Sequence, residues 1–599
     1  MPNLLAMSFE GSVTPAFDLH CLEPGRTPPD GWGIACYPGG EPAALVLKEA
    51  GPAHGSPSSA LVSAWERLES SIFVVHIRTA VWGAITEANT QPFQRAWGRR
   101  DWVIAHSGSL ERKLEPGPLF EPVGSTDTEQ ILCDLLARVA DRGYRCIGDV
   151  SAQLLVSWFQ ELNVRGGLTT ALADGEDLVV YADRRGNGEA WVCELLPPHG
   201  EMAFGDKDLT VDLTRRGIHS RKGILVSSEP LDRRKGASGA WKKLTPGHLL
   251  VVRQGAVRAD VGLEPAESRP TVAVPPVRAA PAVATLPVAT QPPPFVQRAR
   301  PVHSTARAEV RRYEVLHRTV YRYRETVERS AHVLRLFPAH DRLQTVHSSR
   351  LEISVEGQHR EFEDVFGNRV RRLMLDTPFT ELSIAAHSDV EVLDVDPLDF
   401  RPARVRVTIP LVWMPWQRQI LQPFLLPPEL PESELIELNE YAMSFARRND
   451  YELLDALLDL NATMFSEHRY EQGTTSHATS PFDVYTTRRG VCQDFANLFI
   501  CLARLLGVPA RYVCGYIFTG ETPEHARMAE ESHAWVQVYL PEVGWKGFDP
   551  TNGKLTQSDH VRVAVGRNYI DATPTSGTLY VGGAGESLSV EVKMERVRR

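Results

Sequence analysis

The sequence predicts an α+β protein built from several domains. A chain of 599 residues is too long for one ordinary core, and a proline-rich stretch near its middle divides it in two. Both parts mix the two-residue apolar period of strands with the three-to-four-residue period of helices. Hydrophobic residues make up 43% and charged residues 23%, as in ordinary folded proteins.

We expect the first domain to span residues 1–260 and to be a layered α/β or α+β unit. Short apolar stretches typical of strands occur in "SIFVVHIRTA", "DWVIAHSG", "DLVVYAD" and "GILVSSEPL". Helical spacing of apolar residues occurs in "TDTEQILCDLLARVADRG".

Residues 261–308 are expected to be a linker. The stretch from 264 to 303 holds ten prolines among scattered Ala and Val, with neither a helical nor a strand period. Proline fixes φ and removes a backbone donor, so this composition predicts an extended, semi-rigid connection.

After the linker the pattern predicts two more units. Residues 309–425 alternate in "RYEVLHRTVYRYRETV", "SSRLEISVEG" and "SDVEVLD", with a turn at "DVFGNRV", which predicts a small β-sandwich. Residues 426–599 begin with the helical patterns "ELIELNEYAMSFARR" and "YELLDALLDLNATMFSEHR" and return to strands from about residue 511. This last unit is expected to be α+β.

Composition excludes several classes of function. The net charge of −10 and pI near 6.1, without a basic stripe, are unlike a nucleic-acid-binding protein. The eight cysteines form no CxxC pair, which argues against structural zinc or a disulfide framework and favours a reducing compartment. No run of some 18 apolar residues and no basic leader is found. We therefore expect a cytoplasmic protein without a membrane span.

Cys492 lies directly before a predicted helix in "RRGVCQDFANLFICLARLLGVPARY". Free amide groups and the positive end of the helix dipole favour a thiolate at that position, and the same amides can bind an oxyanion. The predicted helix has one apolar face and stops at Gly507 and Pro509; the face consists of Phe495, Leu498, Phe499, Leu502, Leu505 and Leu506.

His533 and Asp549 are candidate partners of this thiol. His533 opens the predicted strand "HAWVQVYL", and Asp549 closes the next one, "GWKGFDP". Nucleophile, base and orienting carboxylate are the parts of a covalent catalytic triad. Judged by residue types alone, a buried cysteine and a satisfied core histidine are the commoner arrangement. A metal site is a third reading, but no fourth ligand stands at a recognisable spacing, so we expect neither metal nor cofactor.

Three motifs resemble the bacterial transglutaminase-like superfamily: "GVCQDFANL", "ESHAWVQVYLPEVGWKGFDPTNG" and "HVRVAVGRNYIDATPTSG". The upstream "HRTVYRYRETV", "LRLFPAHDR" and "DVFGN" resemble the β domain that precedes that core, so the resemblance covers about residues 311–599. It implies a papain-like core with Cys492 as nucleophile, His533 as general base and acid, and Asp549 orienting the imidazole. Asn497 stands where many relatives have histidine.

Two further cysteines and one histidine are expected to be structural. Cys501 lies inside the predicted helix and Cys514 in the strand that follows, so both are read as small core residues. His525 lies in the charged loop "TGETPEHARMAEES" and is expected to be solvated.

The first domain resembles the class II glutamine amidotransferases, which have an αββα N-terminal-nucleophile fold. The matching pieces are "NLLAMS", "DGWGIA", "HIRTAVWGAITEANTQPF", "AHSGSL", "STDTEQI" and "GILVSSEPL". In that family the residue after the initiator Met is the nucleophilic cysteine, and an Asn-Gly pair after a histidine forms the oxyanion hole. Here those positions hold Pro2 and, after His106, Ser107 and Gly108. We therefore expect no release of ammonia from glutamine.

The resemblance nevertheless implies that residues for ligand binding remain. Arg78 would pair with the α-carboxylate of glutamine and Asp127 with its α-ammonium, and Gly108 belongs to the same candidate site. The alternative is that internal ion pairs hold Arg78 and Asp127 for folding alone.

The sequence thus predicts a cysteine enzyme that acts on a peptide or protein amide. Cys492 would form an acyl-enzyme that water or an amine resolves. One alternative is a non-catalytic protein that binds a glutamine or γ-glutamyl group. Another is an active amidotransferase that supplies ammonia, which Pro2 disfavours. The substrate, the acceptor and the oligomeric state are left open.

Overall fold

The fold is described from a computed structural model with side chains. It describes residues 4–597 except for the following positions: 20–28, 41, 67, 80–83, 113, 115–116, 118, 187, 207, 216–219, 236–240, 263–308, 400–405, 474–478, 521–531. Pro2, most of the predicted linker and His525 lie outside the described residues. Among the described helices, none combines the length and the apolar character needed to cross a membrane.

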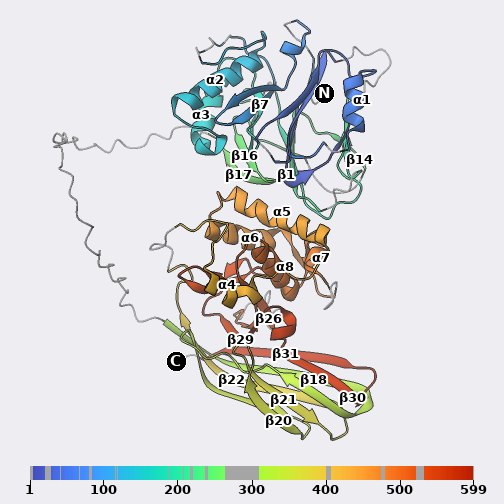
Figure 1. Ribbon diagram of the computed structural model, residues 1–599, viewed down its shortest axis with the longest axis vertical. Coiled ribbons are helices and arrows are strands. Elements are labelled where there is room, and N and C mark those ends of the chain that lie inside the picture. Colours follow the sequence, from blue (N-terminus) through green and yellow to red (C-terminus); the bar gives the residue numbers. More distant parts are fainter. Residues whose placement is uncertain are drawn as a thin grey trace, which may run out of the picture.

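The first domain contains two large antiparallel sheets packed face to face (Figure 1). One has the strand order β15-β10-β13-β1-β5-β3-β4, and the other has the order β17-β16-β9-β8-β7-β6. Small apolar side chains fill the space between them, for example Ala6 and Val74 from one sheet against Ala105 and Ala171 from the other. Because the strands are buried on both faces, their sequences are continuous runs of apolar residues.

The outer faces of these sheets are covered differently. Helices α2 and α3 pack on the sheet that contains β7. The other sheet is covered by the short helix α1 and by a four-stranded sheet of order β14-β11-β12-β2. The elements are β1 Leu4–Val13, β2 Ala16–Leu19, β3 Gly31–Pro38, β4 Leu45–Glu49, α1 Pro57–Ala64, β5 Ser70–Arg78, η1 Glu87–Asn89, β6 Phe93–Trp97, β7 Arg100–Ser107, α2 Asp127–Asp141, η2 Ile147–Asp149, α3 Ala152–Asn163, β8 Thr169–Ala173, β9 Asp177–Tyr181, β10 Trp191–Leu195, β11 Ala203–Gly205, β12 Leu209–Asp212, β13 Gly223–Ser227, β14 Asp232–Lys235, β15 Lys242–Lys243, β16 Leu249–Arg253 and β17 Ala256–Val261.

The β domain is organised around one long strand, β18 (Glu309–Leu334). Its first half pairs with β22 and β31, and its second half pairs with β21 and β30. All seven strands are joined in one hydrogen-bonded sheet, and residues of β18, β21 and β22 share one apolar core. The small sandwich expected from the sequence stays a prediction. The remaining strands are β19 Gln344–Ile353, β20 Gln358–Glu363, β21 Arg369–Leu375, β22 Phe379–Asp394, β30 Thr575–Gly582 and β31 Ser587–Arg596.

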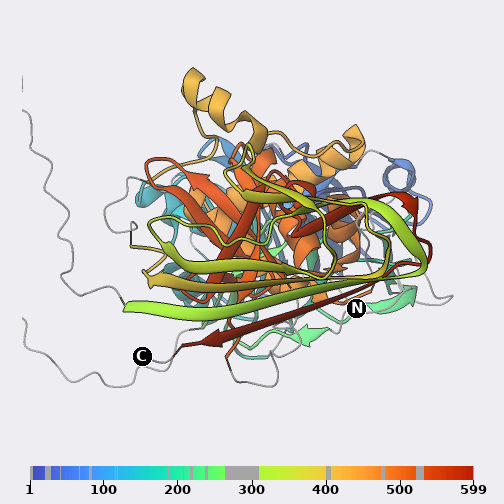
Figure 2. The ribbon, with the colours of Figure 1, turned by 90° about the horizontal axis from the view of Figure 1, so that it is seen from below.

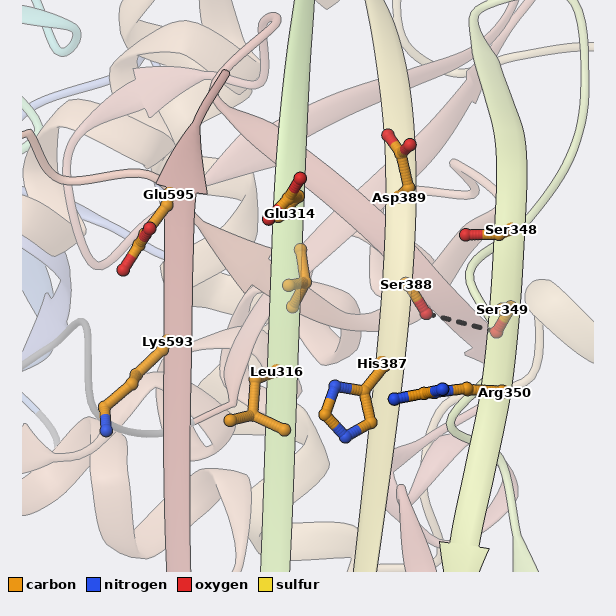
Figure 3. Close-up of a pocket in the computed structure, with 11 residues that line it drawn as sticks. Glu314, Leu316, Ser348, Ser349, Arg350, His387, Ser388, Asp389, Lys593 and Glu595 are labelled. Carbon is orange, nitrogen blue, oxygen red and sulfur yellow. Dashed lines mark hydrogen bonds between the residues drawn. The ribbon is translucent and has the colours of Figure 1, made fainter.

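Two of these strands come from the C-terminal end of the chain. β30 and β31 fall in the range expected for the catalytic unit, yet they pair with β18 and lie at the bottom of Figure 1 beside it. The face of the sheet turned to solvent carries polar residues from four neighbouring strands, among them Glu314, His387 and Lys593 (Figure 3). Figure 2 shows the same sheet from below.

The core domain lies between the first domain and the β domain (Figure 1). Helix α8 is surrounded by α5, α6 and α7 and packs on an antiparallel sheet of order β28-β27-β26-β25-β29. Both predicted helices before Cys492 are present as α5 and α6. The elements are α4 Pro415–Leu421, η4 Gln422–Phe424, α5 Glu432–Arg448, α6 Leu453–Glu467, β23 Arg469–Tyr470, α7 Pro481–Thr487, β24 Arg489–Gly490, α8 Cys492–Leu505, β25 Ala510–Ile517, β26 His533–Leu540, β27 Gly544–Asp549, β28 Lys554–Leu555, β29 His560–Gly566 and α10 Tyr569–Ala572.

A buried ion pair joins the first domain to the core domain. Glu10 of β1 is fully buried, and its Oε1 atom lies 3.4 Å from Nη2 of Arg488. Arg488 directly follows α7, and its side chain is 3% exposed. The hydroxyl of Tyr485 donates to the same carboxylate at 3.3 Å. Burial raises the pKa of Glu10, and the charge of Arg488 opposes that rise.

More polar contacts surround this ion pair. Lys222 pairs with Glu467, Arg221 pairs with Glu440, and Arg253 lies 2.9 Å from Asp450. The first partner in each pair belongs to the first domain and the second to the core domain. The two domains therefore share a polar interface that places β1 next to the helices around α8.

Candidate active site

Cys492 is the first residue of α8 and is half-buried. The carboxylate of Asp494 accepts a hydrogen bond from the Val491 N–H at 2.8 Å, which fixes the turn into the helix. Gly490 permits this turn, because a Cβ there would lie 2.9 Å from the Asp494 side chain. The thiol thus sits at the N-terminus of a 14-residue helix, at the positive end of the helix dipole.

The sheet brings His533 and Asp549 together as the sequence predicted. His533 begins β26 and Asp549 ends β27, and the two strands pair antiparallel. The His533 Nε2 atom lies 2.9 Å from Asp549 Oδ2, and both side chains are almost completely buried. Nδ1 is then the ring nitrogen left for the thiol.

His533 and Asp549 shift each other's pKa toward the charged forms. Burial alone would lower the pKa of His533, but the Asp549 carboxylate and the Cys492 thiol raise it to about 10. Burial would likewise raise the pKa of Asp549, yet the charge and hydrogen bond of His533 hold it well below its usual range. At neutral pH the arrangement therefore contains an imidazolium that lies between the Asp549 carboxylate and the Cys492 sulfur.

Three polar residues that the sequence analysis did not single out complete the network. Asn552 donates to Asp549 Oδ2 at 2.6 Å. His560, at the start of β29, places Nε2 3.2 Å from the same oxygen and Nδ1 2.6 Å from Asp559. A sequence signal for His560 was available. It lies in the motif "HVRVAVGRNYIDATPTSG" that resembles the family, and like His533 it is the first residue of a strand.

His533, Asp549 and His560 also meet the basic requirement for a metal site. One ligand atom from each lies within 4.8 Å of the others, and all three residues are buried. Imidazole and carboxylate suit zinc and related ions. The competing interpretation is a hydrogen-bond network that orients His533 toward Cys492, and a chelation experiment separates the two.

Most of the other described cysteines are buried. Burial raises the pKa of Cys36, Cys501 and Cys514 to about 12 in each case. Cys146 is half-buried like Cys492, but burial and the nearby Asp174 raise its pKa to about 11. The expectation that Cys501 and Cys514 are core residues agrees with their burial.

Asn497 is half-buried on α8.

In the first domain, Arg78 is the last residue of β5 and is only 5% exposed. Its Nη2 donates to the Ala84 carbonyl at 3.2 Å, whereas Nη1 has no hydrogen-bond partner among the described residues. Burial lowers the pKa of Arg78, and Asp30 opposes this shift. A buried guanidinium with an open donor is suited to an anionic ligand.

Asp127 and Gly108 occupy neighbouring positions. Asp127 begins α2 and accepts backbone N–H groups of Leu110 at 2.8 Å and Thr128 at 2.9 Å. Gly108 has φ of 142°, and a Cβ there would lie 2.4 Å from the Gly167 carbonyl oxygen, so only glycine fits.

Asn89 connects Arg78 to the region of Asp127. Its amide donates to the Ala84 carbonyl that Arg78 also contacts, and its oxygen accepts the Ser125 N–H at 2.8 Å. The residues expected to hold a glutamine-like ligand are thus linked through one hydrogen-bonded loop.

Known protein families match three separate parts of the chain, in the first domain, the β domain and the core domain. Residues 1–275 match the class II glutamine amidotransferases. Residues 313–391 match the bacterial transglutaminase-like N-terminal region, and residues 440–550 match the transglutaminase-like superfamily.

Two relatives each cover just under half of the chain. YafJ of Escherichia coli, named as a candidate glutamine amidotransferase, is 30% identical over 253 residues, which are 41% of this chain and 91% of that protein. An uncharacterized protein of Mycobacterium tuberculosis is 32% identical over 298 residues, which are 47% of this chain and 91% of its own length.

Two solved structures are similar to just under half of the chain each. A predicted glutamine amidotransferase from Pseudomonas aeruginosa is 28% identical with a TM-score of 0.36, covering 43% of this chain and 99% of that one. A candidate cysteine protease from Cytophaga hutchinsonii is 23% identical with a TM-score of 0.40, covering 49% of this chain and 92% of that one.

Proposed function

Because the chain belongs to the class II glutamine amidotransferases over residues 1–275 and to the transglutaminase-like superfamily over residues 440–550, we propose that its second half is a cysteine-dependent enzyme. It would transfer or hydrolyse the acyl group of an amide. The observation that carries the proposal is the hydrogen bond between His533 and Asp549 at the N-terminus of the helix that begins with Cys492. The proposed catalytic triad is Cys492, His533 and Asp549.

In the first step, the Cys492 thiolate attacks the carbonyl carbon of the amide. The carbonyl oxygen becomes negative next to the N-terminus of α8, where the positive end of the helix dipole stabilises it. The His533 imidazolium gives its proton to the leaving nitrogen, so the C–N bond breaks and an amine departs. A thioester on Cys492 remains.

In the second step, water or an amine attacks the thioester. The nucleophile gives a proton to His533, the C–S bond breaks, and the thiolate is restored. Asp549 holds the imidazole with Nε2 engaged throughout, and His560 and Asn552 hold Asp549. Water yields a carboxylic acid and an amine yields a new amide.

The proposal is tested by trapping the acyl-enzyme. Para-nitrophenyl acetate should transfer one acetyl group to the full chain, and peptide mapping should find it on Cys492. The matched control is Cys146→Ala, because Cys146 is the other half-buried thiol among the described residues. Cys146→Ala should acetylate like wild type and Cys492→Ala should not. Acetylation that survives Cys492→Ala would contradict the assignment.

For the first domain we infer a binding role for a glutamine-like or γ-glutamyl group. The specific observation is the buried guanidinium of Arg78 with Nη1 unpartnered among the described residues. A carboxylate could accept from this group, and Asp127 could accept from an ammonium group in the same ligand. Charged hydrogen bonds of this kind contribute about 1.5–3 kcal/mol each.

Calorimetry of the full chain with glutamine, glutamate and a γ-glutamyl dipeptide tests this role. We expect binding that Arg78→Ala and Asp127→Ala each abolish. Arg215→Ala removes an exposed arginine elsewhere in the domain and should leave it intact. The absence of heat with all three ligands would instead make Arg78 and Asp127 structural.

A further inference from the structure

The first domain places a buried carboxylate against the segment that leads into the candidate active site. Glu10 of β1 pairs with Arg488, and Arg488 stands four residues before Cys492. Neither Glu10 nor Arg488 belongs to the proposed triad. The ion pair therefore connects the first strand of the chain to the turn that holds the proposed nucleophile.

Glu10 is the counter-ion on which Arg488 depends. Among the described residues, Glu10 is the one carboxylate that forms an ion pair with this guanidinium, and both side chains are buried. The Nε atom of Arg488 has no hydrogen-bond partner in the same set of residues. A guanidinium stays charged in a protein, so removal of Glu10 would leave a buried charge without its partner.

Two tyrosines hold the Arg488 guanidinium in place. Its Cζ atom lies 4.6 Å from the ring centre of Tyr441 on α5 and 4.9 Å from that of Tyr485 on α7. Nη1 donates to the Tyr441 hydroxyl at 2.5 Å, and the Tyr485 hydroxyl donates to Glu10 at 3.3 Å. Ring contacts and hydrogen bonds thus fix the Arg488 side chain between the two helices.

The Arg488 backbone connects this side chain to the nucleophile. Arg488 has φ of 54° and ψ of 33°, a left-handed conformation that is costly for a residue with a Cβ and persists where its surroundings enforce it. Its carbonyl accepts the Arg469 N–H at 2.8 Å, and the Gly490 carbonyl accepts the Glu471 N–H at 2.9 Å. Cys492 stands two residues after Gly490, so this turn sets the position of the thiol.

A second contact leads from Arg488 to α8 itself. His468 directly follows α6 and is buried, and burial together with the charge of Arg488 lowers its pKa. The His468 ring centre lies 5.7 Å from that of Phe495. Phe495 is the fourth residue of α8, so this ring packs against the first turn of the helix that begins at Cys492.

We propose that Glu10 is a positioning residue for Cys492, so that the first domain completes the cysteine site of the second half. The proposal rests on the proposed function of that half. Glu10 holds the Arg488 guanidinium, Arg488 holds the left-handed turn, and the turn holds the thiol next to His533. This role of the first domain requires no nucleophile at its own N-terminus and no ligand at Arg78.

The rate of acetylation by para-nitrophenyl acetate tests this role in the full chain. Glu10→Gln keeps the shape of the side chain and removes its charge. It should lower the maximal rate about 10- to 100-fold, because displacement of a reacting group by about 1 Å costs about 10²-fold. KM should stay within about twofold, because the ester itself does not contact Glu10.

Asp450→Asn is the matched control. Asp450 pairs with Arg253 across the same interface, but it belongs to the turn between α5 and α6. Its loss should leave the maximal rate unchanged. Rates are measured well below the melting temperature of each variant, so that a lower stability alone does not reduce them.

A double variant tests whether Glu10 acts through Arg488. Arg488→Met should lower the maximal rate by a factor similar to that of Glu10→Gln, and the double variant should be no slower than Arg488→Met alone. Multiplied effects would show two independent contributions and contradict the proposal. Tyr485→Phe removes the hydroxyl next to Glu10 and should lower the rate about threefold. If Glu10→Gln does not fold, a wild-type rate in Tyr485→Phe overturns the proposal.

Alkylation of Cys492 by iodoacetamide separates this proposal from the proposed function, because it needs no acyl transfer. Peptide mapping should find alkylation of Cys492 at pH 7 about tenfold slower in Glu10→Gln and unchanged in Asp450→Asn. That result in a chain that never acetylates would support the role of Glu10 and reject the acyl-transfer chemistry. A folded Glu10→Gln protein with wild-type rates of acetylation and alkylation, or one in which only KM rises, overturns the proposal.

Discussion

Each half of the chain buries a histidine near the end of a strand, His106 in the first half and His533 in the second. The pKa values of these two imidazoles shift in opposite directions. His106 contacts the Thr128 hydroxyl at 3.3 Å and the Gly167 carbonyl at 3.0 Å, and burial lowers its pKa despite the charge of Asp127. His533 bonds directly to Asp549 at 2.9 Å, and its pKa rises to about 10. A carboxylate in direct contact outweighs burial, whereas neutral partners do not.

The difference shows how binding and chemistry can separate within one protein. The first half has a buried guanidinium with an open donor but proline where its family has the nucleophile. The second half has a thiol at a helix N-terminus facing a charged imidazole. We expect the following changes to test this division, beginning with the largest effect.

Asp549→Asn should lower the rate of acetylation by para-nitrophenyl acetate about 10⁴-fold, because an amide can neither hold the imidazolium nor fix its tautomer. The control Asp399→Asn removes a carboxylate that pairs with Lys546 on the surface of the same half and should leave the rate unchanged. A melting curve of each variant checks that it is folded. A folded Asp549→Asn protein with wild-type rate would remove Asp549 from the triad.

Glutaminase activity should be absent from the unmodified chain, because Pro2 supplies no thiol. Pro2→Cys alone should remain about 10²–10³-fold below the double variant Pro2→Cys with Ser107→Asn, which also restores an amide donor to the oxyanion hole. Ammonia release from glutamine is the measurement. Activity in the unmodified chain would show that the first half still performs chemistry.

The rate of amide turnover should fall at alkaline pH as His533 loses its proton. Its raised pKa of about 10 means that the charged form persists through neutral pH and is lost above it, at about tenfold per pH unit. The same charge adds stability that is complete below the ordinary histidine pKa near 6.5 and lost as pH rises through about 10. A pH–rate profile with a descending limb near 7 would contradict the close pairing with Asp549.

Chelation should have the smallest effect. If His533, Asp549 and His560 form a hydrogen-bond network, dialysis against EDTA should leave acetylation of Cys492 within about twofold of its starting rate. Metal analysis of the purified chain, before and after dialysis, accompanies the assay. Loss of activity that returns with a divalent metal would assign the three residues to a metal site instead.

Local patterns in the sequence predicted much of the site. The apolar face after Cys492 predicted α8, and the strands that begin at His533 and end at Asp549 are present as β26 and β27. These features depend on neighbouring residues and on the pairing of adjacent strands, which sequence periodicity records.

Features that depend on distant pairings were not predictable in this way. The return of β30 and β31 to β18 joins residues separated by more than two hundred positions. His560 reaches Asp549 because β29 pairs with β25, not with its neighbour in sequence. No local period encodes such pairings, so the sheet of the β domain and the full hydrogen-bond network emerged only from the structure.

The buried Glu10 also has a consequence for biosynthesis. Glu10 belongs to the first strand of the chain, while its partner Arg488 is translated far later. At the usual 5–20 residues per second, the first domain waits roughly ten seconds to a minute for that arginine after its own synthesis is complete. During this interval the Glu10 carboxylate lacks the Arg488 guanidinium and the Tyr485 hydroxyl that contact it in the full chain. Ribosome speed between the two domains therefore sets how long the nascent first domain exists without its counter-ion.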